Sequence, residues 1–393
     1  MTVPDFNVGS DGSAASKGRA VLATGAQMHI DFMARALEIS RLGRYWTSPN
    51  PHVGCVLVRE GAVIAEGFTQ PAGGNHAEVE ALVRAGGLAR GATAYVTLEP
   101  CAHTGQTGPC VEALIGAGVA EVIIGVEDPN PLVNGAGIRA LRNAGISVIT
   151  GIHATEITAE LQGFLLRMSR GWGRVRLKLA SSLDGRTAMA SGESQWITSP
   201  EARADVQRLR AESSAILTGI GTVLADDCSL TVRAEELGLA GETLTRATTR
   251  APTRVVLDTN ARLPNAARCL DEPAPLWVMT AEGNSVPAPA RVIPIARTAE
   301  GLLDLHAVMR RLGKEGMNEV LVECGPTLAG ALLRASLIDE LVIYQAPLLL
   351  GKSARPLVDL AFDTLLEGVR LAYRDIRQIG PDLRMMASLE VKD

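Results

Sequence analysis

The chain has 393 residues, which is long enough for two or three domains that each bury a full core. Hydrophobic residues make up 47% and charged residues 21%, as in an ordinary α/β protein, and no apolar run approaches the roughly 20 residues of a membrane-spanning helix. Aromatic residues are only 3% and the net charge is −5, whereas nucleic-acid-binding proteins need basic surface and stacking aromatics. These values predict no membrane and no nucleic-acid partner.

The six cysteines are irregularly spaced, and no secretory segment opens the chain. This usage is typical of free thiols in a reducing compartment rather than of a disulfide framework, so we expect a cytoplasmic protein. Residues 1–26 are rich in Gly, Ser and Ala without hydrophobic periodicity, and they are predicted to form a flexible tail.

Strand and helix patterns then alternate along the first half of the chain. Apolar residues at helical spacing predict a helix from Met28 to about Arg44. The elements predicted next are a strand hairpin at 53–58 and 62–68, a helix from 77, a strand at 92–98, a helix from 110, a strand at 121–126, a helix at 135–143, a strand at 146–150 and a helix at 155–169. R-G-W-G at 170–173 ends the pattern, so residues 27–172 are predicted to form one domain.

Residues 173–393 repeat the alternation and are predicted to form a second domain. Strands fit at 174–180, 214–219, 253–258, 275–280, 291–295, 318–323 and 339–345, and helices at 199–211, 302–313 and 327–335. Segments near 367–376 and 382–390 are expected to pair as antiparallel edge strands, and 231–252 to be a surface excursion. Such alternation predicts mixed or mostly parallel sheets with helices on both faces, and ligands beyond the carboxyl ends of the strands.

One imidazole, one carboxylate and two thiols gather in the stretch from His76 to Cys110. Hydrolytic deaminases of amino-purines and amino-pyrimidines hold zinc with one His and two Cys, and keep a separate Glu as proton carrier. Residues two apart on a regular helix point about 200° away from each other, so His76 and Glu78 can share a target only from a helix's first turn. We therefore predict a catalytic zinc ion on His76, Cys101 and Cys110, with Glu78 as proton carrier.

Eight residues separate the two cysteines, whereas the more familiar deaminase signature has two. A structural Cys₂His₂ site with His103 as fourth ligand is the competing interpretation, although such sites usually take their cysteines from close C-x₂₋₄-C knuckles. The other cysteines Cys55, Cys228 and Cys269 are expected to be small buried groups. Asn50, in the turn before the first strand, either forms that turn or donates a hydrogen bond to a heterocycle.

Two glycine-rich strand-to-helix turns, at 217–227 and 322–330, indicate a dinucleotide site in the second domain. Such turns let backbone amides and a helix N-terminus approach a phosphate, although a plain helix cap is the commoner use. Neither is a complete G-x-G-x-x-G, which makes a Rossmann domain the weaker interpretation. In the turn D-T-N-A-R at 258–262, the hydroxyl of Thr259 and the guanidinium of Arg262 favour a 2′-phosphate and hence NADPH; the alternative is that Asp258 only caps the turn.

Several of these segments together carry a specific likeness. N-P-H-V-G-C-V-L-V, G-G-N-H-A-E-V-E-A-L, L-E-P-C-A-H-T-G-Q-T-G-P-C and D-P-N-P resemble the deaminase half of the bifunctional riboflavin-biosynthesis deaminase/reductase family. L-K-L-A-S-S-L-D-G-R-T-A, S-G-E-S-Q-W-I-T, V-L-A-D-D-C-S-L-T-V-R and V-E-C-G-P-T-L-A-G-A-L-L resemble its reductase half. The likeness runs from about residue 28 to the end in the family's domain order, and the family shares the long gap between the cysteines.

The resemblance implies a cytidine-deaminase-like three-layer α/β domain followed by a dihydrofolate-reductase-like α/β domain. It implies zinc-dependent deamination of 2,5-diamino-6-ribosylamino-4(3H)-pyrimidinone 5′-phosphate, followed by NADPH reduction of the ribosyl group to ribityl, with Lys178 near the ribosyl carbonyl. The implied NADPH contacts are Ser181, Trp196, Thr222, Asp226, Thr259, Gly325, Pro326, Thr327, Leu328, Ala329, Gly330 and Ala331. The implied substrate contacts are Ser194, Arg210, Leu230, Arg233 and Glu323; Asn50 is predicted as a further contact from its place in the turn alone. We also expect a homo-oligomer.

Four positions of the deaminase half depart from the family's pattern. Thr69 stands where the family usually has His, Gln106 and Ala136 where it has Arg, and Leu132 where it has Lys. The zinc ligands are unaffected, and the lost cations bear on the affinity for the substrate phosphate.

Two other functions compete with this one. The first is a reductase whose deaminase domain has drifted into a structural zinc module. The second is a nucleic-acid deaminase with the second half as a targeting module, against which the low aromatic content and the negative net charge both count.

Overall fold

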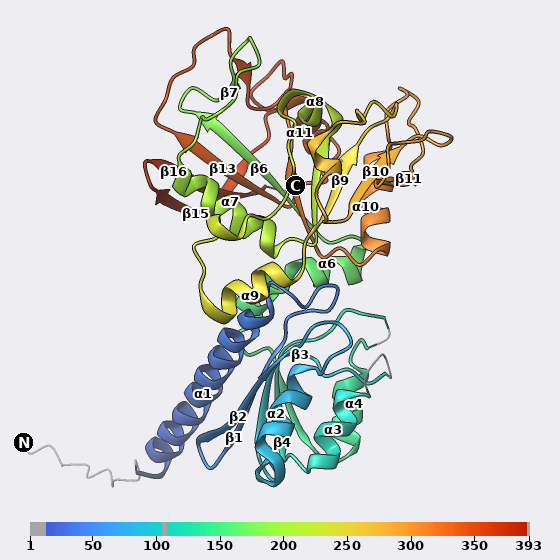
Figure 1. The fold of residues 1–393 in the computed structure, drawn as a ribbon. Helices are drawn as coiled ribbons and strands as arrows, with labels where there is room; N and C mark the ends of the chain where they lie inside the picture. The colour runs from blue at the N-terminus through green and yellow to red at the C-terminus, as the bar shows by residue number, and fades with distance from the viewer. Residues whose placement is uncertain (1–12, 104–107, 132, 391–393) are drawn as a thin grey trace, which may run out of the picture.

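A computed structural model describes residues 13–103, 108–131 and 133–390, with side chains described from Gly25 onward. The chain forms two α/β units, each built around its own sheet, which are drawn below and above in Figure 1. The break between the two sheets falls at residues 171–173, after α6 (Gln162–Arg170) and before β6 (Arg174–Ser182). Within the described residues, no helix is both long enough and apolar enough to cross a membrane.

The first unit has a five-stranded sheet in the order β2-β1-β3-β4-β5. β1 runs antiparallel to β2 and β3, whereas β3, β4 and β5 are parallel. The strands are β1 Gly54–Arg59, β2 Ala62–Phe68, β3 Thr93–Leu98, β4 Glu121–Val126 and β5 Ser147–Thr150. The helices are α1 Ser13–Ser40, α2 Ala77–Ala85, α3 Cys110–Ala117, α4 Ala136–Asn143, α5 Ala154–Glu160 and α6, with short turns η1 Arg41–Gly43 and η2 Gly86–Ala89.

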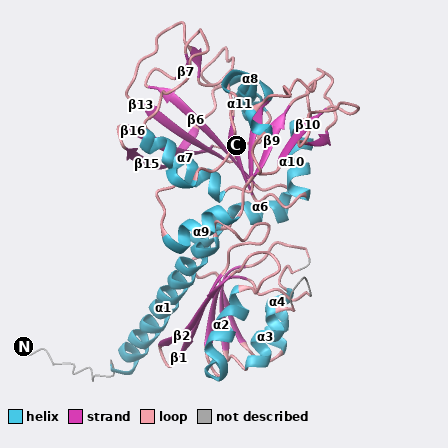
Figure 2. Cartoon of the chain, viewed as in Figure 1, coloured by secondary structure: helices cyan, strands magenta, loops and turns pink. Residues whose placement is uncertain are grey.

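Two glycines show that α1 and α2 pack closely on opposite faces of this sheet. A Cβ atom on Gly54 would lie 1.9 Å from the Ala36 carbonyl oxygen of α1, and one on Gly67 would lie 2.3 Å from the Ala77 carbonyl oxygen of α2. Gly67 pairs with Cys55, the neighbour of Gly54, and successive residues of a strand face opposite sides. The result is the predicted three-layer arrangement, seen in Figure 2 as helices on both sides of the lower sheet.

The second unit has a nine-stranded sheet in the order β11-β10-β9-β8-β12-β6-β13-β16-β15. All neighbours from β11 to β13 are parallel, and the predicted C-terminal hairpin adds two antiparallel strands at one edge. The strands are β6, β8 Ala215–Gly219, β9 Thr253–Leu257, β10 Leu276–Thr280, β11 Arg291–Pro294, β12 Glu319–Glu323, β13 Glu340–Ala346, β15 Leu371–Ile379 and β16 Asp382–Leu389, while β7 Arg186–Ala188 and β14 Arg355–Pro356 form a separate pair. The helices are α7 Pro200–Glu212, α8 Ile220–Asp226, α9 Gly241–Thr249, α10 Leu305–Lys314 and α11 Pro326–Arg334, with short turns η3 Ala234–Glu236 and η4 Arg268–Leu270.

The predicted tail is wrong from Ser13 onward, because α1 begins there. Residues 1–12 lie outside the described part of the chain. The segment S-A-A-S-K-G-R-A-V-L-A lacks an apolar stripe, but its Ala, Lys, Arg and Leu residues have high intrinsic helix propensity. The helix therefore begins at Ser13 although this segment has no apolar face, because its residues favour helix and the following half of α1 packs against the sheet.

Two further predictions of elements need correction. The single helix expected at 155–169 is two helices, α5 and α6, separated at Leu161. The stretch 231–252 is more than a surface excursion, because its helix α9 carries the buried residues Arg246 and Ala247. The side chains that cover Arg246 come from the first domain, so the local sequence pattern does not reveal its burial.

Candidate active sites

His76, Cys101 and Cys110 meet at one end of the first sheet. His76 is the N-cap of α2, Cys101 lies just beyond the end of β3, and Cys110 is the first residue of α3. The Nδ1 atom of His76 lies 3.6 Å from Sγ of Cys101 and 3.3 Å from Sγ of Cys110, and the three ligand atoms all lie within 4.8 Å of one another. Tetrahedral zinc at its usual bond lengths separates a nitrogen from a sulfur ligand by about 3.5 Å, so this donor set fits the ion.

Glu78 stands in the first turn of α2, directly beyond the N-cap His76. Its side chain is buried, and this burial raises the pKa of the Glu78 carboxyl group. The Cys101 thiol is affected in the opposite direction: a hydrogen bond from the Cys110 thiol, and then His76, lower the pKa of Cys101 to about 4. The cluster therefore combines one cysteine, Cys101, that favours the thiolate form with a carboxyl group that can hold a proton.

The described residues do not form the competing Cys₂His₂ site. The group of clustered ligand atoms contains His76 and the two cysteines but not His103. Instead, the Nδ1 atom of His103 is buried without a described hydrogen-bond partner, and the imidazole is close enough to lower the pKa of Asp128. The donor set thus keeps the open fourth position of a catalytic site.

Two acidic residues near this cluster had been expected beyond the carboxyl ends of strands, but the sequence prediction gave them no role. Asp128, just after β4, is buried, and burial raises the pKa of Asp128 to about 6. Glu99, just after β3, accepts hydrogen bonds from the backbone N–H groups of Asp128, Gly135 and Ile138 at 3.1–3.2 Å. Glu99 directly follows β3, and Asp128 is the second residue after β4.

The positions that depart from the family's pattern have different places. Thr69 is buried, and its Oγ1 atom accepts a hydrogen bond of 3.0 Å from the N–H of Val53. Ala136 is the first residue of α4, while Gln106 and Leu132 lie outside the described residues.

Asn50 does form a turn, because its N–H donates to the Thr47 carbonyl at 2.9 Å. It also lines a cavity of about 220 Å³ between the domains, whose lining does not include the three zinc-site residues.

In the second domain, the residues expected at the cofactor lie along the carboxyl edge of the sheet. β9, β8, β12 and β6 are parallel neighbours in that order, so the segments that follow them emerge side by side. Thr259 follows β9, Thr222 lies in α8 after β8, Gly325 follows β12, and Ser181 is near the end of β6.

The start of α11 is suited to a phosphate group. Gly325 is its N-cap, no side chain caps the helix, and a Cβ atom on Gly325 would meet open space. The backbone N–H groups of the first turn therefore remain available to an anion. Within the run from Gly325, Thr327 is exposed, whereas Ala329 and Gly330 are buried against the domain.

Lys178 and Glu323 face each other across the β6–β12 pair, in register. Arg210 of α7 holds Glu323 with two hydrogen bonds, from Nε at 2.6 Å and from Nη2 at 2.9 Å. Burial by itself raises the pKa of Glu323, but Arg210 and Lys178 outweigh it and hold the value at about 2. Burial, together with Arg210, lowers the pKa of Lys178.

Leu230 and Arg233, two further expected substrate contacts, lie in a loop that Arg210 of this triad contacts. The buried Leu230 has a φ of 57°, which is unusual for a side chain of its size. Arg210 also donates to the Thr231 carbonyl at 2.9 Å, and the Arg233 N–H donates to Gln207 at 3.0 Å. These hydrogen bonds fix the loop just after its buried leucine.

Ser194 and Trp196 lie in the loop that follows β7. The hydroxyl of Ser194 donates to Asp226 at 3.2 Å, which ties this loop to α8. Trp196 is 64% exposed, and the Arg203 guanidinium lies 4.4 Å from its ring centroid.

In the turn at 258–262, the side chain of Asp258 points into the domain. Asp258 is fully buried, and its Oδ2 atom accepts the N–H of Leu263 at 2.9 Å. Arg262 is more than half exposed. Arg297 reaches the same turn from beyond β11 and donates to Asn260 at 2.9 Å. This second cation was missed because it lies far along the chain.

Comparisons with known proteins decide the family. The family model described as the RibD C-terminal domain matches residues 174–385, and the one described as the cytidine and deoxycytidylate deaminase zinc-binding region matches residues 26–126. The riboflavin biosynthesis protein RibD of Escherichia coli is 50% identical over 356 residues, which cover 90% of this chain and 97% of that protein. The chain belongs to the RibD family.

Two solved structures of RibD-type proteins have the same architecture. RibD of Acinetobacter baumannii is 44% identical with a TM-score of 0.85, over 93% of this chain and 100% of that one. The diaminohydroxyphosphoribosylaminopyrimidine deaminase/5-amino-6-(5-phosphoribosylamino)uracil reductase of Thermotoga maritima is 32% identical with a TM-score of 0.82, over 93% and 99% of the two chains.

Membership of the RibD family confirms the predicted fold class and the predicted pair of activities. The protein is a bifunctional deaminase and reductase of riboflavin biosynthesis, with a zinc-dependent first domain and an NADPH-dependent second domain. The alternative of a reductase with a merely structural zinc module receives no support, since the first domain matches a deaminase zinc-binding region in its own right.

Proposed function

We propose that the first domain removes the 2-amino group of the diaminohydroxyphosphoribosylaminopyrimidine that names the Thermotoga maritima relative, and that the second domain reduces the ribosyl group of the product to ribityl. The product would be 5-amino-6-(5-phosphoribitylamino)uracil. The observation that carries this proposal is the cluster of His76, Cys101 and Cys110 next to the buried Glu78, in a chain that continues into a RibD reductase domain.

In the deaminase domain, we assign His76, Cys101 and Cys110 as the zinc ligands. Zinc, when bound, supplies a Lewis acid that lowers the pKa of water. Glu78 would take one proton from the attacking water and pass it to a ring nitrogen, and would then take the proton of the added hydroxyl group and pass it to the amino group, which leaves as ammonia. Its raised pKa suits this role, because the group must hold the proton between the two transfers.

In the reductase domain, NADPH supplies a hydride when it is bound. We assign Lys178 to the ribosyl carbonyl, where its ammonium group would stabilise negative charge that develops on oxygen. Glu323 and Arg210 would orient the substrate while each neutralises the other's charge. Asn50, Ser194, Leu230 and Arg233 complete the proposed substrate contacts. The proposed cofactor contacts are Ser181, Trp196, Thr222, Asp226, Thr259 and the run Gly325, Pro326, Thr327, Leu328, Ala329, Gly330 and Ala331.

The proposed preference for NADPH rests on the turn at 258–262. We expect the double variant Thr259→Ala/Arg262→Ala to raise the KM for NADPH at least about tenfold, because each charge-assisted hydrogen bond to the 2′-phosphate contributes on the order of 1.5–3 kcal/mol. The KM for NADH and the rate of deamination should stay nearly unchanged, because neither depends on that phosphate. Initial rates at varied cofactor concentration measure this. Equal weakening of both cofactors would mean that the turn serves folding only.

The whole assignment is tested by incubating the full chain with the diaminopyrimidine phosphate, with and without NADPH. Ammonia should be released in both cases, and NADPH absorbance should fall only after deamination has supplied the reductase substrate. Consumption of NADPH without any release of ammonia would favour a reductase with an inert first domain. Absence of both reactions would overturn the proposed substrate.

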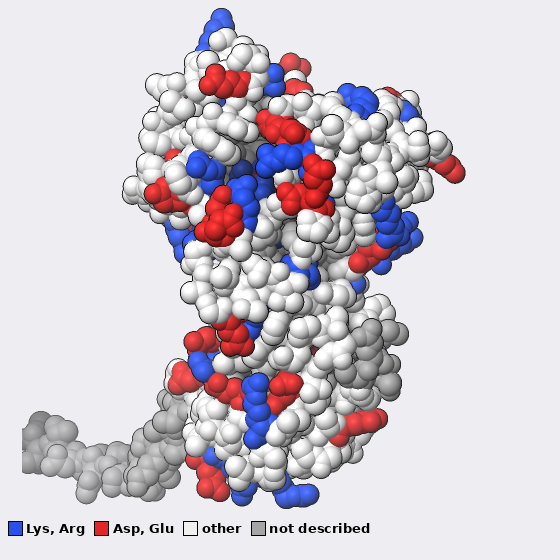
Figure 3. Space-filling model, viewed as in Figure 1, with Lys and Arg blue, Asp and Glu red and all other residues white. Residues whose placement is uncertain are grey.

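We further propose a homo-oligomer that works in the cytoplasm. The edge strand β15 and its neighbour β16 expose Tyr373, Ile376 and Leu383. An exposed apolar surface is unusual at a free sheet edge, and this observation supports an oligomer. Supporting a small-molecule substrate rather than a nucleic acid, Lys and Arg side chains are interspersed with Asp and Glu on the face seen in Figure 3.

A further inference from the structure

The loop that carries Asn50 is held in place by the other domain. We call residues 44–53 the Asn50 loop; it joins η1 to β1 in the deaminase domain. The side-chain amide of Asn318, which lies just before β12 of the reductase domain, donates to the Pro49 carbonyl at 3.0 Å. The Oδ1 atom of Asn318 accepts a 2.6 Å hydrogen bond from Arg167, which itself donates to the same Pro49 carbonyl at 3.1 Å.

A second contact joins two hydroxyl groups next to Pro49. Ser48 and Ser214, which precedes β8, have their Oγ atoms 3.0 Å apart. The Ser214 oxygen already accepts the N–H groups of Asn318 and Glu319, at 3.2 and 3.3 Å, so its own proton is directed to Ser48. The reductase backbone thereby fixes the hydroxyl that holds the loop.

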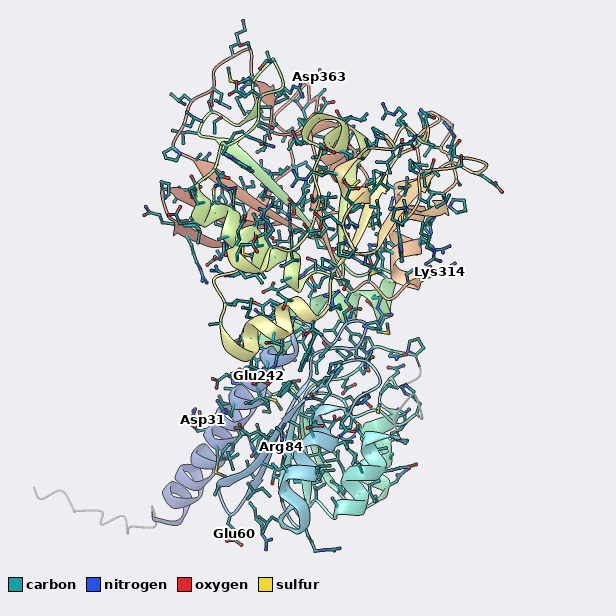
Figure 4. All side chains as sticks on the ribbon, viewed as in Figure 1. Asp31, Glu60, Arg84, Glu242, Lys314 and Asp363 are labelled. Carbon is teal, nitrogen blue, oxygen red and sulfur yellow. The ribbon has the colours of Figure 1, made fainter. Side chains whose placement is uncertain are left out.

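A third contact comes from α9, which lies between the domains beside the end of α1 (Figures 1 and 4, where Glu242 in the first turn of α9 is labelled). The guanidinium of Arg246 lies 5.2 Å from the ring centroid of Trp46 and 4.9 Å from that of Phe68. The two rings also stack on each other, with centroids 6.4 Å apart. Because Arg246 is only 6% exposed, water screens this cation–π contact little.

The reductase domain also packs closely against the Asn50 loop. A Cβ atom on Gly316 of the reductase domain would lie 2.9 Å from the Cβ atom of Pro49. Arg44, at the start of the loop, pairs with Glu160 of its own domain and lies 3.4 Å from Glu212 at the end of α7. The reductase domain thus contacts the loop at its start, at Trp46 and along Ser48–Pro49.

We propose that the reductase domain positions the Asn50 loop for deamination, and that Asn318, Ser214 and Arg246 are positioning residues of a reaction that takes place in the other domain. The inference rests on the proposed function, in which Asn50 contacts the pyrimidine substrate. A binding group displaced by about 1 Å can cost up to roughly 10²-fold in rate, so contacts that fix a loop have a measurable effect on substrate binding.

Two variants test the inference from different sides of the loop in the full-length zinc enzyme. Asn318→Asp keeps the acceptor for Arg167 but removes the donor to Pro49, and Arg246→Ala removes the cation from Trp46 and Phe68. Each should raise the KM for the deaminase substrate about tenfold, with a much smaller change in kcat because the zinc site is untouched. Zinc content and the kinetics of the reductase should stay at the values of the unaltered enzyme.

A matched control is Arg291→Ala, because the guanidinium of Arg291 lies 5.1 Å from the Trp277 ring centroid within the reductase domain. It removes the same kind of contact away from the Asn50 loop and should leave the deaminase KM unchanged. An unchanged deaminase KM in both test variants, or a parallel loss of both activities, would overturn the inference. Failure of the unaltered enzyme to deaminate would overturn the proposed function, and the inference with it.

Discussion

Replacement of Glu78 by Gln is expected to lower the rate of deamination by roughly 10²–10⁴-fold, the range that general acid–base catalysis contributes. Gln has the shape and polarity of Glu but cannot carry a proton between water, ring nitrogen and ammonia. The site around it should persist, because none of the three clustered ligand atoms belongs to Glu78. Ammonia release from the diaminopyrimidine phosphate measures the loss.

Two readouts separate this loss from a collapse of the domain. The Glu78→Gln protein should retain about one zinc per chain, and its reductase should turn over supplied deaminated substrate at the normal rate. Cys101→Ser is the contrasting variant, since it should lose both zinc and deamination while reduction continues. A folded, zinc-free protein with undiminished deamination, or an equal loss of both activities in Glu78→Gln, would show that the site is wrongly assigned.

Replacement of Lys178 by Met is expected to lower the rate of reduction by about 10²–10³-fold, as does the removal of a preorganised group that stabilises charge in a transition state. Met keeps most of the apolar length of the side chain but has no ammonium group, and Glu323 keeps Arg210 as its partner. Deamination should be unaffected. The exposed Lys314 at the end of α10 provides a matched control, because Lys314→Met should leave both rates unchanged (Figure 4).

The pH profile of the reductase adds a second readout for Lys178. Burial lowers the pKa of this amine, so the charged form is lost at a lower pH than for an ordinary lysine. The rate of reduction should therefore fall as the pH rises through that lowered pKa. In Lys178→Met this alkaline fall should disappear; its persistence would assign the titration to another group.

Residues that act within one local element were predictable from sequence. The one His, two Cys and one Glu of a hydrolytic deaminase predicted the zinc cluster, and helix geometry supported it, because His76 and Glu78 share the start of one helix and Cys110 starts another. The parallel strands likewise placed Thr259 and Gly325 on one sheet edge. The contacts that could not be predicted are those between chain segments that meet only in the folded protein.

Glu99, Arg246 and Asn318 illustrate that limit. Glu99 was read as part of a motif, yet its carboxylate fixes backbone N–H groups up to 39 residues further on. Arg246 lies in the stretch 231–252 that was predicted to be a surface excursion, but its aromatic partners, Trp46 and Phe68, belong to the other domain. Asn318 has its partner 269 positions earlier in the chain. No periodicity or spacing encodes such pairs, because they depend on how two complete domains dock.

The direction of β6 sets the route that an intermediate must take. The strand leaves the domain boundary at Arg174, and its nine residues end at Ser182. At about 3.3 Å per residue, the reducing edge of the sheet is thus roughly 30 Å from the junction with the first domain. β6 is an inner strand of the nine-stranded sheet, with β12 on one side and β13 on the other. On the proposed assignment, the product of the first domain therefore has to pass from the domain junction to the carboxyl half of this sheet before it is reduced.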